Sequence, residues 1–204
     1  MITRRRLAAL GAGLLLGLLA TGCAVRPPAP EASDDSVRLT DWTPPPAPAE
    51  WQLDGRTSLR LGEEGATASV TWRQDEAAYR IDLRGAFGAG SLRISGAADG
   101  VTVRTADGER YRAESPRELV RAVTGYDLPV GFLRFWVTAQ PVPWLEGRVT
   151  LDDAGRPGVI RQGGWRVTYE NFESVSGYSL PGRVAVTKAE TSIRMVVRNW
   201  APGG

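Results

Sequence analysis

Residues 51–61, Trp-Gln-Leu-Asp-Gly-Arg-Thr-Ser-Leu-Arg-Leu, alternate apolar and polar side chains over most of their length. The same two-residue period returns in residues 69–73 and 79–84, and then in 92–94, 101–103, 165–169, 184–186 and 193–197. Alternation over short segments separated by turns predicts antiparallel strands with one buried and one solvated face. The chain is therefore expected to be mainly β, with Arg, Thr and Ser on the solvated face of its sheet.

Two short helices are predicted within this series of strands. Residues 115–118, Ser-Pro-Arg-Glu, combine an N-cap serine, a proline at the first helical position and a glutamate at the capping-box position. An apolar stripe of Leu119, Val120 and Val123 follows them. A second helix is expected to start near Pro129 and to end before Pro141, with an apolar face of Val130, Leu133, Trp136 and Val137.

Helices among about ten strands must bury their apolar stripes against the apolar face of the sheet. We therefore expect a strongly curved antiparallel sheet of about 10–11 strands, an incomplete barrel that covers the short helices around an apolar interior. Such an interior is either a packed core or a ligand cavity. Alternation alone does not distinguish the two.

The amino terminus has the layout of a lipoprotein signal. Arg4, Arg5 and Arg6 precede an apolar stretch from Leu7 to Ala20, which is too short for a membrane-spanning helix of about 20 residues. Small residues then lead to Cys23, the only cysteine of the chain. This arrangement resembles the bacterial lipobox, which implies that residues 1–22 are removed and that Cys23 is lipidated. Ala24, in place of an aspartate, implies the outer membrane as the destination.

Residues 23–49 are rich in proline and alanine, and this composition predicts an extended, lipidated tether rather than a packed core. One domain is expected to follow, over residues 50–201. Trp42 could instead cap this domain, and the sequence leaves that alternative open.

Composition excludes several kinds of site. Removal of residues 1–22 takes away three of the 25 Lys and Arg and none of the 23 Asp and Glu, so the mature chain carries a net charge of −1. This charge gives no support to nucleic-acid binding. The absence of histidine excludes Ser-His-Asp triads, Cys-His pairs and histidine zinc sites. The adjacent carboxylates of residues 34–35, 63–64 and 152–153 are typical of solvated turns, so we expect no catalytic residue, no metal and no cofactor.

An ordered set of motifs resembles the LolB family, the outer-membrane lipoprotein receptors of Gram-negative bacteria. The resemblance runs from Trp51 to Trp200 and includes residues 51–56, 83–88, 115–119, 128–137, 141–143, 162–169 and 180–181. It implies a protein that accepts acylated lipoproteins from the periplasmic carrier LolA and inserts them into the inner leaflet of the outer membrane. It also implies a monomer anchored at the periplasmic face through Cys23, without enzymatic activity. The proline-rich stretch before Trp51 departs from the helical segment expected in the family.

The resemblance also suggests functional residues. Phe87 stands in a glycine-rich connection where turn residues are normally polar, and the matching loop of the family carries an apolar residue that engages the membrane. The alternative is that Phe87 packs onto the domain. The predicted cavity lining comprises Leu59, Trp72, Ile81, Leu83, Leu92, Ile94, Leu119, Leu133, Trp136, Trp165, Val167 and Tyr169. Two other functions remain open: a binding module for free lipid or glycolipid, and a structural lipoprotein with a solid core.

Overall fold

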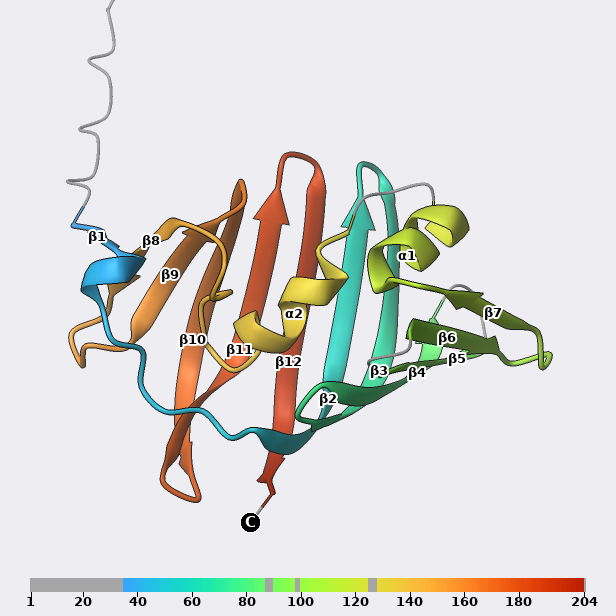
Figure 1. Ribbon diagram of the computed structural model, residues 1–204, viewed down its shortest axis with the longest axis horizontal. Coiled ribbons are helices and arrows are strands. Elements are labelled where there is room, and N and C mark those ends of the chain that lie inside the picture. Colours follow the sequence, from blue (N-terminus) through green and yellow to red (C-terminus); the bar gives the residue numbers. More distant parts are fainter. Residues whose placement is uncertain (1–34, 87–89, 98–99, 125–127, 204) are drawn as a thin grey trace, which may run out of the picture. The chain divides into compact units, whose positions relative to one another are not determined.

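The computed structural model describes residues 35–203, except 87–89, 98–99 and 125–127. Twelve antiparallel strands form one open sheet in the order β1-β8-β9-β10-β11-β12-β2-β3-β4-β5-β6-β7 (Figure 1). The expected mainly β class and incomplete barrel are confirmed. The number of strands exceeds the expected ten or eleven, because the short β1 pairs at an edge of the sheet within the proline-rich region.

The chain builds the sheet in two halves. The first half holds β2 (Glu50–Leu61), β3 (Glu64–Asp75), β4 (Ala78–Ala86), β5 (Gly90–Ala97), β6 (Gly100–Thr105) and β7 (Arg110–Ala113). The second half holds β8 (Gly147–Leu151), β9 (Pro157–Gln162), β10 (Trp165–Val175), β11 (Tyr178–Lys188) and β12 (Thr191–Pro202). The last strand, β12, pairs along its length with β2 and joins the halves.

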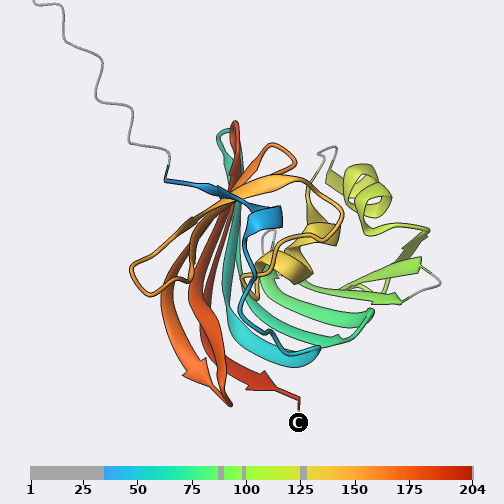
Figure 2. The same cartoon turned by 60° about the vertical axis from the view of Figure 1, so that its left-hand side comes forward.

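Register places the apolar members of neighbouring strands on one face. Leu53 lies opposite Trp72, Trp72 opposite Ile81, and Ile81 opposite Ile94. Because side chains alternate along each strand, this register gathers the apolar set on the side that faces the helices. Figure 2 shows that the sheet curves around this face.

Glycine is required by geometry at one turn and at one close contact between strands. Gly163 and Gly164 both have positive φ, of 57° and 78°, and form the two-residue turn between β9 and β10, where other residues would be strained. Gly55 lies against β12, and a Cβ added there would stand 2.2 Å from the carbonyl oxygen of Val196. This contact lies beside an irregularity in the β12–β2 register between Val197 and Asn199.

The two predicted helices are confirmed as α1 (Pro116–Thr124) and α2 (Val130–Trp136). The Ser115 hydroxyl accepts a hydrogen bond of 3.2 Å from the Glu118 backbone N–H, as an N-cap residue does. Both helices lie on the concave side of the sheet (Figures 1 and 2). The buried Trp136 fixes α2 to this side.

The second part of the proline-rich region packs against the domain. β1 (Val37–Arg38) pairs with β8, and the 3-10 turn η1 (Leu39–Asp41) follows. Trp42 packs on the core cluster of the second half, and the Gln140 side chain donates a hydrogen bond of 2.9 Å to the Pro45 carbonyl. The sequence predicted a tether over residues 23–49, whereas residues 36–48 lie on the folded unit because Trp42 and Pro48 bury apolar surface there. Residues 23–34 lie outside the described residues.

Candidate functional site: an apolar cavity

A cavity of about 480 Å³ opens between the first half of the sheet and the two helices. Its walls come from β2 to β6, from β12, and from α1 and α2. The volume falls within the range of about 300–1,000 Å³ that ligand sites usually occupy. The half of the sheet around this cavity is therefore not a solid core.

Small side chains create this space. Thr57, Ala66 and Ala68 line the cavity from β2 and β3, where larger residues would fill it. The second half of the sheet carries large aromatics on the same face instead. Trp165 of β10 stands 6.5 Å from Trp136 of α2, and Phe132 of the same helix packs edge-on against Trp136. The volume of the side chains on this face, rather than the alternation along the strands, thus determines which half of the sheet borders a cavity and which half is packed.

The structure divides the predicted lining residues between these halves. Eight of them line the cavity, namely Leu59, Trp72, Ile81, Leu83, Leu92, Ile94, Leu119 and Leu133. The other four belong to the packed cluster of the second half, namely Trp136, Trp165, Val167 and Tyr169. These four sit on the predicted apolar face, but aromatic neighbours occupy the space beside them.

Three of the lining residues that the sequence did not predict carry an aromatic ring or a charge. Trp144 follows α2, is 62% exposed and packs edge-on against Phe135 at 5.3 Å. Arg134 lies on α2 and Tyr79 on β4. The alternation with Ile81 and Leu83 could have identified Tyr79, whereas no sequence signal pointed to Arg134 or Trp144.

The cavity is almost free of charge. Arg134 is the one charged side chain among the described lining residues. Burial raises the pKa of the Tyr79 hydroxyl, and the Arg134 charge acts in the opposite direction. Such a lining suits an apolar ligand with a polar end.

Two predicted residues, Cys23 and Phe87, lie outside the described residues. Residues 87–89 connect β4 to β5, and Leu83 and Leu92, which face each other on these strands, both line the cavity. Across the described ranges, no group of three or more His, Cys, Asp or Glu side chains could hold a metal ion. None of the helices within those ranges combines the length and apolarity needed to cross a membrane.

The predicted carboxylate turn at residues 152–153 is present. The Asp152 carboxylate accepts hydrogen bonds from the backbone N–H groups of Ala154 and Arg156, at 3.0 and 2.9 Å, and pairs with the Arg156 guanidinium. This pattern is that of a side chain that closes a turn. Its neighbour Asp153 is exposed at the same turn.

An open antiparallel sheet around helices, with an apolar cavity between them, defines a class of proteins that enclose apolar ligands. The sequence profile of the outer membrane lipoprotein LolB matches residues 49–200. The chain belongs to the LolB family of outer-membrane lipoproteins.

Relatives in two organisms support this assignment. The outer-membrane lipoprotein LolB of Halorhodospira halophila is 37% identical over 198 residues, which cover 93% of each chain. That of Alkalilimnicola ehrlichii is 39% identical over 156 residues, which cover 76% of this chain and 78% of the relative.

Solved structures give looser likenesses. A DUF1329 family protein from Desulfovibrio piger aligns with a TM-score of 0.48 and 7% identity, over 76% of this chain and 86% of that one. A LolA superfamily protein from Nitrosomonas europaea aligns with a TM-score of 0.42 and 11% identity, over 75% and 86%.

Proposed function

We propose that this outer-membrane lipoprotein accepts acylated lipoproteins from the periplasmic carrier LolA and inserts them into the inner leaflet of the outer membrane. The observation that carries the proposal is the cavity of about 480 Å³ with its nearly uncharged lining. LolB proteins take part in lipoprotein trafficking and are not enzymes. Membership of this family makes an acyl chain the natural occupant of the cavity.

Energetics explain why such a receptor needs an apolar cavity. A triacylated protein carries roughly 45 methylenes, and their exposure to water costs about 0.8 kcal/mol each, or about 36 kcal/mol in all. Unaided passage through water is therefore excluded. Transfer between two proteins needs no nucleotide if the receiving cavity replaces the burial that the carrier supplied.

Two further residues complete the proposal. Lipid on Cys23 anchors the monomeric receptor to the periplasmic face of the membrane, through a tether that reaches the folded unit at residue 36. Phe87, at the connection between β4 and β5, touches the bilayer during delivery. The lipobox and the apolar residue in a glycine-rich connection support these roles.

A matched pair of variants on β5 tests the cavity. Leu92 faces the cavity, and the neighbouring Ser91 is exposed on the other face of the strand. Both changes to glutamate alter the charge by the same amount. Leu92→Glu should weaken binding of an acylated lipoprotein by at least about tenfold, because it places a charge in the apolar lining. Ser91→Glu should bind as the wild type does.

The ligand comparison separates the receptor from its alternatives. The wild type should bind the acylated lipoprotein and accept it from LolA, and should not bind the unacylated form. Equal affinity for free lipid and for the acylated lipoprotein would support a lipid-binding module instead. If Leu92→Glu and Ser91→Glu bound the acylated lipoprotein equally well, the cavity would not be the binding site.

A further inference from the structure

Arg134 is held in a defined place beside the cavity. Its guanidinium lies 4.6 Å from the centre of the Phe135 ring, and Phe135 packs edge-on against Trp144 at 5.3 Å. Arg134 and Trp144 both line the cavity. A guanidinium over an aromatic face keeps its N–H groups available for hydrogen bonds in the plane of the group.

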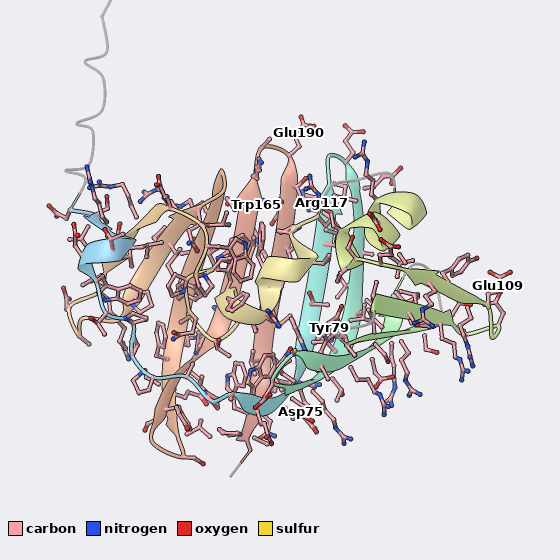
Figure 3. The ribbon with its side chains drawn as sticks, in the orientation of Figure 1. Asp75, Tyr79, Glu109, Arg117, Trp165 and Glu190 are labelled. Atoms are coloured by element: carbon pink, nitrogen blue, oxygen red, sulfur yellow. The ribbon has the colours of Figure 1, made fainter. Side chains whose placement is uncertain are left out.

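No carboxylate neutralises this charge within the described residues. The lining that they form contains no Asp or Glu, and no ion pair among them involves Arg134. Of the acidic residues labelled in Figure 3, Glu109 and Glu190 lie at hairpin turns that contribute no residue to the lining, and Asp75 is not a lining residue. No carboxylate among the described residues therefore uses the donors of the half-buried guanidinium.

A second donor lines the same cavity. The Tyr79 ring lies across Gly96 on the neighbouring strand, and a Cβ added to Gly96 would stand 2.2 Å from this ring. The absence of a side chain at residue 96 thus lets Tyr79 lie flat in the wall. Burial raises the pKa of Tyr79, so its hydroxyl keeps its proton at neutral pH.

We propose that Arg134, with the Tyr79 hydroxyl beside it, binds the ester oxygens through which acyl chains join glycerol, while the chains fill the apolar lining. This inference rests on the proposed receptor function and specifies which group of the ligand the receptor recognises. An ester carbonyl loses its water when its chain enters a cavity, and it then needs a donor. A guanidinium supplies strong charge-assisted hydrogen bonds at that point.

An ester-to-ether comparison tests the proposal on the full mature protein. The probes are a diacylglyceryl-cysteine lipopeptide and its dialkyl ether analogue of equal chain length, which lacks the carbonyl oxygens. The wild type should bind the ester about tenfold more tightly than the ether. Arg134→Met should lose most of this preference and keep only the part that the Tyr79 hydroxyl supplies.

Three controls make the result decisive. Arg121→Met, an exposed change on α1, should keep the ester preference. Arg134→Gln retains a neutral donor and should keep part of the preference, which covers the case in which the methionine variant does not fold. Phosphatidylglycerol, which adds a phosphate to the same esters, should lose no more affinity on Arg134→Met than the neutral lipopeptide does.

The outcomes distinguish this inference from the function on which it rests. Failure of the wild type to bind either probe would overturn the receptor function. Equal loss of ester and ether binding in Arg134→Met would overturn the inference alone. A loss confined to phosphatidylglycerol would make Arg134 an anion site and would overturn the ester assignment.

Discussion

At the scale of single residues, the buried side chain of Gln162 makes four hydrogen bonds. Its side-chain oxygen accepts hydrogen bonds from Trp136 Nε1 at 3.1 Å and from the Val142 N–H at 2.9 Å. Its side-chain nitrogen donates to the carbonyls of Val142 and Leu145, at 3.0 and 2.8 Å. One buried amide thus ties α2 and the segment that carries Trp144 to β9.

Gln162→Leu should lower the free energy of unfolding by about 3 kcal/mol. The leucine would leave Trp136 Nε1, the Val142 N–H and the Leu145 carbonyl without these partners, whereas the Val142 carbonyl keeps a hydrogen bond of 3.1 Å from the Leu145 N–H. Each buried polar group left without a partner costs about 1–3 kcal/mol before relaxation. Urea denaturation followed by circular dichroism measures the loss. Arg161→Leu, at the exposed neighbouring position, is the control and should change stability by less than about 1 kcal/mol.

Tyr169 presents the opposite case. Its hydroxyl is buried and has no hydrogen-bond partner among the described residues. Burial raises the pKa of Tyr169 well above its ordinary value of 10.0. Tyr169→Phe should therefore stabilise the protein by about 1 kcal/mol at neutral pH, because it removes a desolvated group that gains no bond. Thermal and urea unfolding of the two proteins measure the difference.

The same substitution has a pH signature. Above about pH 10 the unfolded tyrosine releases its proton while the folded one keeps it, so the wild type loses stability as the pH rises. The phenylalanine variant lacks this loss. Its advantage should widen between pH 9 and pH 11, and a constant difference would show that Tyr169 titrates alike in both states.

At the scale of elements, an arginine ladder crosses one end of the sheet. Arg38, Arg148, Arg161 and Arg166 stand directly opposite one another on β1, β8, β9 and β10. All four are exposed. Like charges in directly opposed positions destabilise a sheet by a few tenths of a kcal/mol to about 1 kcal/mol per pair.

Arg161→Thr should raise the free energy of unfolding by about 0.5 kcal/mol at low salt, because Arg161 has an arginine on either side. The gain should vanish at about 1 M salt, where charges are screened within a few ångström. Arg183→Thr is the matched control, since Arg183 faces Glu170 on the neighbouring strand at 3.6 Å. It should not stabilise the protein, and a gain as large as that of Arg161→Thr would contradict the ladder.

Local signals predicted most elements. The proline and serine before α1 fixed its start, and alternation located eight of the twelve strands, because both signals depend on neighbouring residues only. Alternation did not locate β7, β8 or β9. β1 could not be predicted, since it is two residues long and its pairing with β8 depends on contacts far along the chain. The packing of Trp42 against the core cluster also depends on contacts far along the chain, and the proline-rich composition around Trp42 does not predict it.

At the scale of the whole folded unit, the position of the cavity could not be predicted. Apolar alternation is equally regular around Trp72, which lines the cavity, and around Val167, which lies in the packed cluster. The difference lies in the neighbours: Ala66 and Ala68 leave space on one side, and aromatic rings fill the other. Packing volume is a property of the assembled sheet, which a two-residue period does not record.

The proposed role of Phe87 in delivery to the membrane belongs to this scale, because it would link the cavity to the connection between β4 and β5. A large apolar side chain that enters the bilayer gains about 1.5–3 kcal/mol, enough to favour release without holding the domain there. Phe87→Glu should leave acceptance from LolA nearly intact and slow insertion of clients into liposomes by about tenfold or more, because a charge disfavours the apolar layer.

Phe87→Leu supplies the matched control, since it keeps apolar bulk at the same position and should insert clients at nearly the wild-type rate. Acceptance is measured by transfer of a labelled lipoprotein from LolA, and insertion by its recovery with liposomes. The strands that flank residues 87–89 also line the cavity, so both steps are measured on each variant. A Phe87→Glu variant that no longer accepts lipoprotein from LolA would indicate that Phe87 acts in the cavity wall. A variant that accepts clients and inserts them into liposomes at the wild-type rate would show that Phe87 has no role in delivery.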